Sequence, residues 1–390
     1  MGKLQIMPQA VICGAGWAGM NCARVLQERG FSVQVLEKSD RPGGRITSDF
    51  VDGFTIDNGF QVVNPAYAEL RETAIMDGLA SFKLAKGLEI VETNRIYKVG
   101  DPRSDLRFIP DLLSAKFGST FEKLSFLGYL RRATEDKTFG EALGDFPNLF
   151  RNLLKPFLDG VVLTDVSSVS NRVVRELIHW FIKGNPVLID GGVGRVSEAL
   201  AAGLDIEFNV EVKSVTERTV STTRGEITAD AVVVATDPIT ASRLLGLNMP
   251  KMNYSETWYF DIAGGNVTSK FLRVGGEGPV VNSIALSNVA PSFAPSGRTL
   301  VAATTLKSAS ESSVRSHLSK LWSVETQHWR LITKREIPYS LPFKGSKSAM
   351  VDELRVAGIW CAGDWRTTPS QQGALLSGKL VANAISSFQY

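Results

Sequence analysis

Gly14-Ala15-Gly16-Trp17-Ala18-Gly19 is the stretch of this 390-residue chain that decides the fold. An apolar run at 10–13 precedes it and predicts a strand, and the pattern of 20–29 predicts a helix. A second predicted strand, 31–36, then leads to Glu37. Strand, glycine turn, helix, strand and acid in this order predict a dinucleotide-binding unit, and therefore an α/β fold with a Rossmann-like domain. The alternative is a glycine turn between two core elements.

In such a unit, each of the three glycines and the acid has a different structural role. We expect Gly14 to permit the tight turn, Gly16 to let a pyrophosphate approach the backbone, and Gly19 to let helix and strand pack closely. The helix N-terminus adds free N–H donors and the positive end of its dipole. Glu37 lies 18 positions after Gly19, where a carboxylate can accept hydrogen bonds from both ribose hydroxyls. Because this carboxylate would repel a 2′-phosphate, NADP is disfavoured, and NAD and FAD remain.

A basic turn that contains glycines follows the acid. Lys38 begins it and Gly43-Gly44-Arg45 ends it. Paired glycines permit close backbone approach to an anion, and guanidinium groups neutralise its charge. The plain alternative is an exposed basic turn. Further on, 51–63 predicts a hairpin and a return strand with a tight loop at 57–59.

The other end of the chain carries a second strand and helix. The stretch 358–364 predicts a buried strand that ends in Gly363 and Asp364, and 373–385 predicts a helix with a face of small residues. A strand-end carboxylate can meet a ribityl hydroxyl, and a helix N-terminus can face the electron-rich side of an isoalloxazine ring. These elements favour FAD, an extended cofactor held by both ends of the chain.

Four blocks together resemble the FAD-dependent amine oxidase and phytoene desaturase superfamily. They are the glycine motif 14–19 with Glu37, the turn Gly43-Gly44-Arg45, the strand end Ala362-Gly363-Asp364, and Gln-Gly-Ala-Leu-Leu-Ser-Gly at 372–378. The last block looks closer to the carotenoid-desaturase-like branch, whose members act on long apolar polyenes. The resemblance covers both ends and the middle of the chain.

The resemblance implies a Rossmann-like FAD-binding domain of the GR2 type, interleaved with an α+β substrate domain. We expect 1–95, 186–250 and 343–390 to form the discontinuous FAD-binding domain. The segments 96–185 and 251–342 then form the substrate domain. Helical spacing in the substrate segments predicts three helices, at 121–132, 172–182 and 311–321.

The resemblance also implies which residues hold the cofactor. In the family, the valine that matches Val212 holds the adenine through its backbone, and the strand ending at Ala235 lies near it. We expect the 372–374 backbone at the pyrimidine end of the ring and 59–61 along its other edge. The expected cofactor-binding residues are Gly14, Gly16, Trp17, Ala18, Gly19, Glu37, Lys38, Gly43, Gly44, Arg45, Gly59, Phe60, Gln61, Val212, Ala235, Gly363, Asp364, Gln372, Gly373 and Ala374. No side chain is assigned as a catalytic group, and no metal ligand is predicted.

Chain length, net charge and the cysteines limit which classes of function we expect. A chain of 390 residues exceeds one ordinary domain, and 43 Lys and Arg against 40 Asp and Glu leave a net charge of +3, too small to indicate nucleic acid. Cys13, Cys22 and Cys361 predict buried thiols in a reducing compartment, and none stands where a covalent flavin link would form, so we expect FAD to be non-covalent. The start of the chain is too short for a signal peptide and no 18-residue apolar run occurs, so we expect a soluble, cytoplasmic protein. The apolar and basic stretch 149–158 favours a core helix, and it leaves peripheral membrane contact open.

Two other glycine-containing stretches have competing interpretations. The stretch 373–379 has the spacing of a phosphate-binding loop, but Leu380 replaces the required Ser or Thr, and we reject it. The stretch 192–197 is similar to a second nucleotide fingerprint without its last glycine, which would indicate a pyridine-nucleotide reductase. The family resemblance instead implies a glycine turn before a helix at 195–202.

The expected chemistry is oxidation of a C–H bond in an apolar or amphipathic small molecule, with hydride transfer to flavin N5. The electron acceptor stays open between oxygen and a quinone. Amine oxidation is disfavoured because Ser370 stands where amine oxidases of the family place an aromatic residue. A flavin-dependent isomerase of a polyene-like substrate and a non-catalytic flavin-binding protein are the alternatives. Trp365 either packs on the cofactor or covers the strand end as a core residue.

Overall fold

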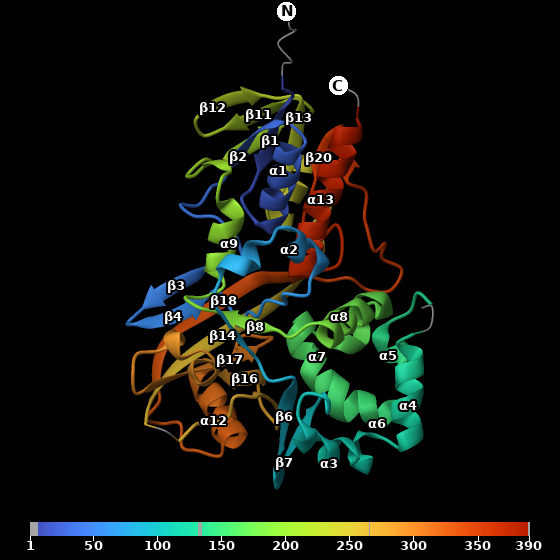
Figure 1. Ribbon diagram of the computed structural model, residues 1–390, viewed down its shortest axis with the longest axis vertical. Coiled ribbons are helices and arrows are strands. Elements are labelled where there is room, and N and C mark those ends of the chain that lie inside the picture. The colour runs from blue at the N-terminus through green and yellow to red at the C-terminus, as the bar shows by residue number, and fades with distance from the viewer. Residues whose placement is uncertain (1–6, 132–134, 265, 389–390) are drawn as a thin grey trace, which may run out of the picture.

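The structure, a computed structural model, describes residues 7–131, 135–264 and 266–388. Two large sheets organise it, one in the upper and one in the lower part of Figure 1. The upper sheet has the strand order β19-β20-β13-β1-β2-β9, and all its strands are parallel except β19. Its strands are β1 (Gln9–Cys13), β2 (Ser32–Leu36), β9 (Asp205–Glu207), β13 (Ala231–Val234), β19 (Arg355–Val356) and β20 (Ile359–Cys361). A parallel sheet with helices confirms the predicted α/β class.

Alternate residues of the upper sheet face two different layers, as the pleat requires. Ile12 and Val35 pack on the helical layer, and Val11 and Cys13 pack on a small antiparallel sheet and one further helix. The helical layer consists of α1 (Trp17–Glu28), α9 (Gly194–Ala201) and α13 (Gln371–Ser387). The opposite layer consists of β10 (Val212–Val215), β11 (Thr219–Thr222), β12 (Gly225–Thr228) and α10 (Pro238–Leu245). This three-layer unit brings the two ends of the chain together.

The lower sheet has seven strands in the order β18-β14-β17-β16-β15-β6-β7. Its pairs are antiparallel except β15 with β6. The strands are β6 (Gly87–Glu92), β7 (Arg95–Gly100), β14 (Met252–Ala263), β15 (Leu272–Gly275), β16 (Val280–Ala285), β17 (Arg298–Thr305) and β18 (Arg330–Pro342). Helix α12 (Glu311–Trp322) covers one face through Val314 and Leu318. The domain limits stay a prediction, but β6 already pairs in this sheet, whereas the expected FAD segment ran to 95.

Short elements connect the two sheets and complete the lower part. Two-stranded ladders join β3 (Ser48–Val51) with β4 (Phe54–Asp57) and β5 (Ser81–Lys83) with β8 (Val187–Ile189). The short helices are α2 (Ala68–Glu72), α3 (Ile109–Leu112), α5 (Phe139–Ala142), α6 (Pro147–Leu149), α7 (Lys155–Val162) and α11 (Leu286–Val289), and the longer ones are α4 (Thr120–Tyr129) and α8 (Asn171–Lys183). Helices α4, α8 and α12 confirm the three predicted helices, although Arg132 lies outside the described residues.

The stretch 149–158 and the cysteines are part of the core. Leu149 and Leu158 are buried, in one cluster with residues of α5 and α8. All three cysteines are buried, and desolvation raises the pKa of the Cys13 and Cys361 thiols to about 12. Within the described ranges, no helix combines the length and the apolar character needed to cross a bilayer. Residues 1–6 of the N-terminal stretch fall outside those ranges.

Candidate cofactor site

The glycine turn between β1 and α1 contains two glycines fixed by packing and one that faces open space. A Cβ on Gly14, which has a φ of +109°, would lie 2.7 Å from the Ala235 carbonyl oxygen. A Cβ on Gly19 would lie 2.0 Å from the Gly14 carbonyl oxygen. A Cβ on Gly16 would meet no described atom within 4 Å. The turn therefore leaves its backbone open at Gly16, which a close phosphate contact requires.

The N-terminus of α1 is free to receive an anion. Among the described residues, no side chain caps it, and its first turn contains no acid. The first-turn residues Trp17, Ala18 and Gly19 are buried, so their N–H groups are held in a low-dielectric setting. The Trp17 indole N–H donates to Ser197 Oγ at 2.9 Å, which anchors its ring on α9.

Protein groups orient the Glu37 carboxylate at the end of β2. Its Oε2 accepts the Ala15 N–H at 2.8 Å, and its Oε1 accepts the Ser39 N–H at 2.9 Å and the Ser39 hydroxyl at 2.7 Å. The side chain is buried, and an ionised carboxylate has about four acceptor positions. At least one acceptor position of the carboxylate is left for a ribose hydroxyl. The hydrogen bond from the Ala15 N–H links the acid to the glycine turn.

The other residues expected near the adenosine differ in burial. Val212 opens β10, and Ala235 follows β13 and packs against Gly14; both are buried. Lys38 extends to the surface, where its Nζ lies 3.7 Å from Asp237 Oδ2. A cofactor contact by the Lys38 side chain would therefore compete with its exposed ion pair to Asp237.

The second pair of glycines lies against the first turn. The Gly43 N–H donates to the Ala15 carbonyl at 2.8 Å, and Gly16 and Gly43 form an isolated parallel bridge. The only described atom near a Cβ on Gly44 would be the Gly16 Cα, at 3.8 Å. The open space at Gly16 therefore continues to Gly44, and two side-chain-free backbone segments border it.

Arg45 joins the first block of the chain to the last. Its Nη2 donates to Asp364 Oδ1 at 2.6 Å, and its Nη1 donates to the Ser340 carbonyl at 2.9 Å. The Asp364 side chain is 6% exposed and that of Arg45 is 32% exposed. The Gln61 amide donates to the Arg45 carbonyl at 2.9 Å. The structure thus gathers three of the predicted blocks around one ion pair.

The start of α13 presents backbone rather than side chains. Ser370 caps the helix, its Oγ accepting the Gly373 N–H at 2.9 Å. A Cβ on Gly373 would lie 1.8 Å from the Thr368 carbonyl oxygen. The Gln372 side chain points to α2 and accepts the Glu69 N–H at 3.3 Å. Any contact from Gln372, Gly373 or Ala374 to a ring must therefore come largely from the main chain.

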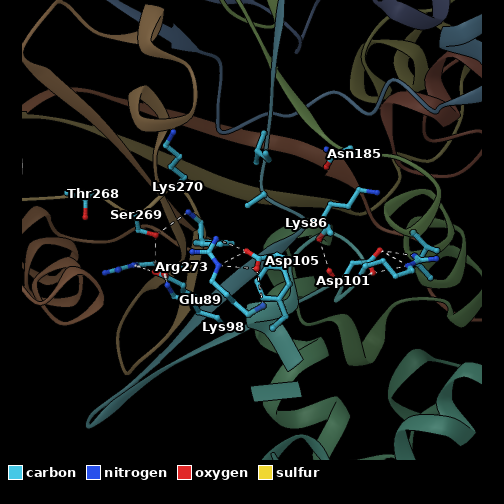
Figure 2. Close-up of a pocket in the computed structure, with 18 residues that line it drawn as sticks. Lys86, Glu89, Lys98, Asp101, Asp105, Asn185, Thr268, Ser269, Lys270 and Arg273 are labelled. Carbon is cyan, nitrogen blue, oxygen red and sulfur yellow. Dashed lines mark hydrogen bonds and ion pairs between the residues drawn. The ribbon is translucent and has the colours of Figure 1, made fainter. Parts of the chain in front are cut away.

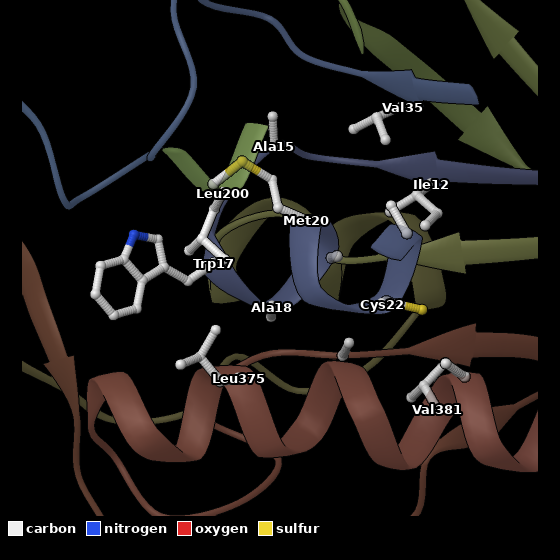
Figure 3. Close-up of a cluster of buried hydrophobic side chains, with 14 of the residues drawn as sticks. Ile12, Ala15, Trp17, Ala18, Met20, Cys22, Val35, Leu200, Leu375 and Val381 are labelled. Atoms are coloured by element: carbon white, nitrogen blue, oxygen red, sulfur yellow. The ribbon is translucent and has the colours of Figure 1, made fainter. Parts of the chain in front are cut away.

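Helices α1 and α13 approach each other backbone to backbone (Figure 3). A Cβ on Gly378 would lie 2.2 Å from the Ala18 carbonyl oxygen. The Asn21 amide donates to the Leu375 carbonyl at 2.7 Å. This packing fixes the N-terminal ends of the two helices relative to each other.

The segment 59–61 lies between Arg45 and the lower sheet. Gly59 has a φ of +91°, and a Cβ there would lie 2.9 Å from Ile337 Cδ1. The Phe60 N–H donates to Thr257 Oγ1 of β14 at 3.3 Å. On the C-terminal side, the Gly363 N–H donates to Ser377 Oγ at 2.9 Å. The segment therefore reaches the region between the two sheets, where the ring is expected.

Two alternatives were left open by the sequence: the position of Trp365 and a second dinucleotide site at 192–197. Trp365 packs in one cluster with Val212 and Cys361, which favours the core alternative. A Cβ on Gly192 would lie 2.4 Å from Ser48 Oγ, so no room for a second dinucleotide remains at that glycine. Helix α9 begins directly after this turn, at Gly194, as the family resemblance implied.

Sequence reasoning missed a buried polar group next to α13. Thr368 Oγ1 donates to Glu176 Oε2 of α8 at 2.6 Å. Arg366 is buried, and its Nε has no hydrogen-bond partner in the described structure. Burial lowers the pKa of Lys344, and Asp352, 3.1 Å from its Nζ, opposes that shift. Thr368 and Glu176 are 192 positions apart, so no local pattern could reveal the pair.

The geometry fits FAD at both ends. An uncapped helix, an open double-glycine border and an oriented acid suit the adenosine and pyrophosphate, and a second helix N-terminus suits the ring. A model of the family "flavin containing amine oxidoreductase" matches residues 17–386. The chain belongs to this family. The flavin family confirms the resemblance seen in the sequence, while the individual cofactor contacts stay a prediction.

Known members of the flavin-containing amine oxidoreductase family differ in substrate. The chain is 24% identical over 251 residues to polyamine oxidase 2 of Arabidopsis thaliana, covering 58% of this chain and 50% of the relative. It is 26% identical over 191 residues to 4,4′-diapolycopene oxygenase of a Methylomonas species, covering 45% and 38%. An oxidoreductase of Methanosarcina mazei has the same fold, with a TM-score of 0.79 at 14% identity over 96% of this chain and 100% of that one. The chain spans about half the length of the curated relatives it matches.

Proposed function

We propose that the protein is an oxidoreductase with non-covalently bound FAD that dehydrogenates an apolar or amphipathic small molecule. When bound, FAD would supply a hydride acceptor at N5. The residues of this chain would hold the substrate, orient it toward the start of α13 and exclude water. The electron acceptor, oxygen or a quinone, is part of the proposal.

A small apolar hollow beside the start of α13 supports this proposal. Its volume of about 10 Å³ holds about one water molecule, so a substrate enters it only if the surrounding helices and strands move apart. Helices α7 and α8 and strands β14 and β18 enclose it, and it ends at Pro369, one residue before the cap of α13. Its apolar lining comes from Val162, Val169, Val173, Leu177, Leu341 and Phe343. None of its described lining residues is an acid. A cationic amine would enter it without a counter-charge, whereas an apolar substrate would gain from desolvation.

Lys344, the one cation among the described lining residues, already binds groups of the protein. Lys344 Nζ donates to the Ala349 carbonyl at 2.7 Å and pairs with Asp352. Asn253 donates its amide to the Val162 carbonyl at 2.8 Å. With both polar groups satisfied by the protein, the hollow offers mainly a shape and an apolar surface to a substrate.

Amine oxidation is a second candidate, and a specific observation favours it. Glu176 lies next to the hollow on α8 and reaches Thr368 in the loop before α13. A substrate ammonium that displaced the Thr368 hydroxyl would find this carboxylate. The polyamine oxidase relative is consistent with that chemistry.

An anaerobic bleaching assay tests the proposal. FAD-loaded protein is mixed with isoprenoid alcohols, polyenes and linear diamines, and the loss of oxidised-flavin absorbance is followed. We expect an isoprenoid or polyene to bleach the flavin and diamines to leave it oxidised. Bleaching by diamines alone would replace the proposal with amine oxidation. Product formed without net reduction of any acceptor would indicate the isomerase instead.

A pair of variants on α8 ties the activity to the hollow. Leu177→Phe adds volume that a hollow of about 10 Å³ cannot hold, so it closes this wall and should raise KM by about tenfold for a lost apolar contact of ~1.4 kcal/mol, in protein that thermal unfolding and the flavin spectrum show to be folded. His179→Phe places the same ring on the exposed side of the helix and serves as the control. Equal KM values for the two variants would contradict this assignment.

A further inference from the structure

A second cavity lies away from every block predicted to hold FAD. Its volume is about 970 Å³, at the upper end of the range typical for small-molecule sites. Strands β6 and β7, the 3-10 helix Leu106–Phe108, the loop 268–271 and the end of α8 surround it (Figure 2). It shares no lining residue with the apolar hollow or with the expected cofactor contacts.

The wall of this cavity is cationic. Six basic residues line it, against the three acids Glu89, Asp101 and Asp105. The excess of three positive charges equals the net charge of the whole chain, and a concave surface concentrates the field of such charges. The six basic residues are Lys86, Lys98, Arg103, Arg107, Lys270 and Arg273.

Part of this charge is neutralised by fixed internal pairs. Arg273 Nε donates to Glu89 Oε2 at 2.7 Å, and Ser269 Oγ donates to the same oxygen at 3.0 Å. Lys98 Nζ lies 3.6 Å from Glu89 Oε1, so two cations share one carboxylate that is only 3% exposed. This buried group fixes the floor of the cavity and leaves it one positive charge in excess.

Two ammonium groups are left without an acid. Arg103 and Arg107 are each bound by the aspartate two positions earlier, at 2.8 and 2.7 Å. Among the described residues, no carboxylate lies within ion-pair distance of Lys86 or Lys270. These two lysines supply the remaining excess charge, although the charge of Lys86 also acts on Asp101. In Figure 2 the two lysines lie on opposite sides of the cavity, and their side chains extend away from each other.

Aromatic rings form the apolar part of the same cavity. The partly exposed Phe271 meets the fully buried Phe108 edge to face, with their centroids 5.8 Å apart, so only the Phe271 ring is open to a ligand. Leu84 and Ile182 add aliphatic surface. Asn185 Oδ1 is shielded from solvent and has no hydrogen-bond partner in the described structure. The cavity thus combines an excess of positive charge with an apolar surface, and the Asn185 oxygen, an acceptor, is left for a donor group of a ligand.

We propose that this cavity binds an anionic small molecule with an aromatic or apolar body. The excess positive charge of the wall, with Lys86 on one side and Lys270 on the other, attracts the anionic group of this molecule. The body of the molecule packs on Phe271, Leu84 and Ile182. Desolvation of this apolar surface and the field of the excess cations together supply the affinity. The site is distinct from the proposed flavin and substrate sites, so a ligand can occupy it while FAD is bound.

Two dyes that differ in one charged group test the proposal. Anilinonaphthalene sulfonate carries an anion on an aromatic body, and N-phenylnaphthylamine lacks the sulfonate. Both are titrated by fluorescence into FAD-loaded protein, in which the anion site at α1 is filled. We expect the sulfonate to bind more tightly than the neutral dye and to weaken as sodium chloride is added. Equal affinity for the two dyes, or no effect of salt, would overturn the proposal without any variant.

Charge-reversal variants then place the site. Lys86→Glu with Lys270→Glu changes the charge of the cavity wall by four units, from two positive to two negative groups, and should weaken sulfonate binding by about tenfold or more. Lys307→Glu, at an exposed lysine outside the cavity, should leave binding unchanged. Flavin absorbance and thermal unfolding serve to show that each variant is folded. Retained sulfonate affinity in a folded double variant would move the binding elsewhere and overturn the assignment.

Discussion

Arg45 and Asp364 are 319 positions apart in the chain, and 2.6 Å separates their Nη2 and Oδ1 atoms. This one ion pair connects the turn after Glu37 with the end of strand β20. Because the Asp364 side chain is nearly fully buried, it depends on Arg45 for a counter-charge. This dependence predicts how the free energy of unfolding changes when either residue is substituted.

Arg45→Ala should lower the free energy of unfolding more than the double variant Arg45→Ala/Asp364→Ala does. The single change leaves a buried carboxylate unpaired, and we expect a loss of about 1–3 kcal/mol, reduced from fully buried pairs because Arg45 is partly exposed. Urea unfolding of the FAD-free protein measures the cycle. Additive effects of the two single changes would show that the pair is not coupled.

Glu37→Ala should release most of the FAD at concentrations at which the unmodified protein retains it. The change removes the proposed ribose acceptor and the bond to the Ala15 N–H, so we expect a Kd increase of at least about tenfold. Glu37→Gln keeps one neutral acceptor, and its Kd for FAD should lie between those of the unmodified protein and Glu37→Ala. The measurement is flavin absorbance after gel filtration. A fully yellow Glu37→Ala protein would contradict the assignment of this acid.

Gly378→Ala should destabilise the protein by about 1–3 kcal/mol, because its Cβ would lie 2.2 Å from the Ala18 carbonyl oxygen and force α1 and α13 apart. Gly128→Ala in α4 is the matched control. Among the described residues its Cβ would have no neighbour within 4 Å, and loss of a helical glycine there should stabilise the protein by ~0.5–1 kcal/mol. Thermal unfolding of both variants distinguishes packing from helix propensity. A stable Gly378→Ala protein would argue against the close helix contact.

Asp57→Asn should stabilise the protein near neutral pH and have little effect near pH 4. Burial raises the pKa of Asp57 to about 6, while the Ser48 hydroxyl and the Val193 N–H, both donating to its Oδ1, oppose the shift. The folded state therefore holds the proton more tightly than the unfolded state, whose pKa is about 3.9. The free energy of unfolding then falls as pH rises from about 4 to about 6, by up to ~3 kcal/mol. The amide keeps the acceptor oxygen without the charge.

Asp49→Asn is the control for this pH dependence. Arg41 lowers the pKa of Asp49 through a hydrogen bond, so its contribution is present at neutral pH and lost in acid. Urea unfolding at several pH values should show opposite signs for the two substitutions. Parallel pH profiles for the two variants would contradict the assigned origin of the Asp57 shift.

The local motifs were predictable because their physics is local. The positive φ of Gly14 and the contact of Gly19 with the Gly14 carbonyl both lie within the turn, so a short sequence window contains their reason, whereas the contact of Gly14 with Ala235 does not lie within it. The cap of α4 is local in the same sense, since Ser119 accepts the N–H of Glu122, three positions later. The helices of the substrate segments followed from apolar spacing in the same way.

Features that join distant segments could not be predicted. Strand β6 pairs parallel with β15 of a segment more than 170 residues later, so nothing near residue 87 indicates that the lower sheet begins there. Glu176 meets Thr368, and Lys86 lies across a cavity from Lys270, for the same reason. Such neighbours follow from the topology of the two sheets rather than from spacing.

The shared layer of α1 and α13 also bears on synthesis. Strand β1 is translated before its partner β13 and before helix α13, which follow more than 200 residues later. This layer therefore stays incomplete while the residues in between are synthesised, with apolar surface on β1 and α1 awaiting partners. We expect flavin uptake at this layer to follow the synthesis of α13.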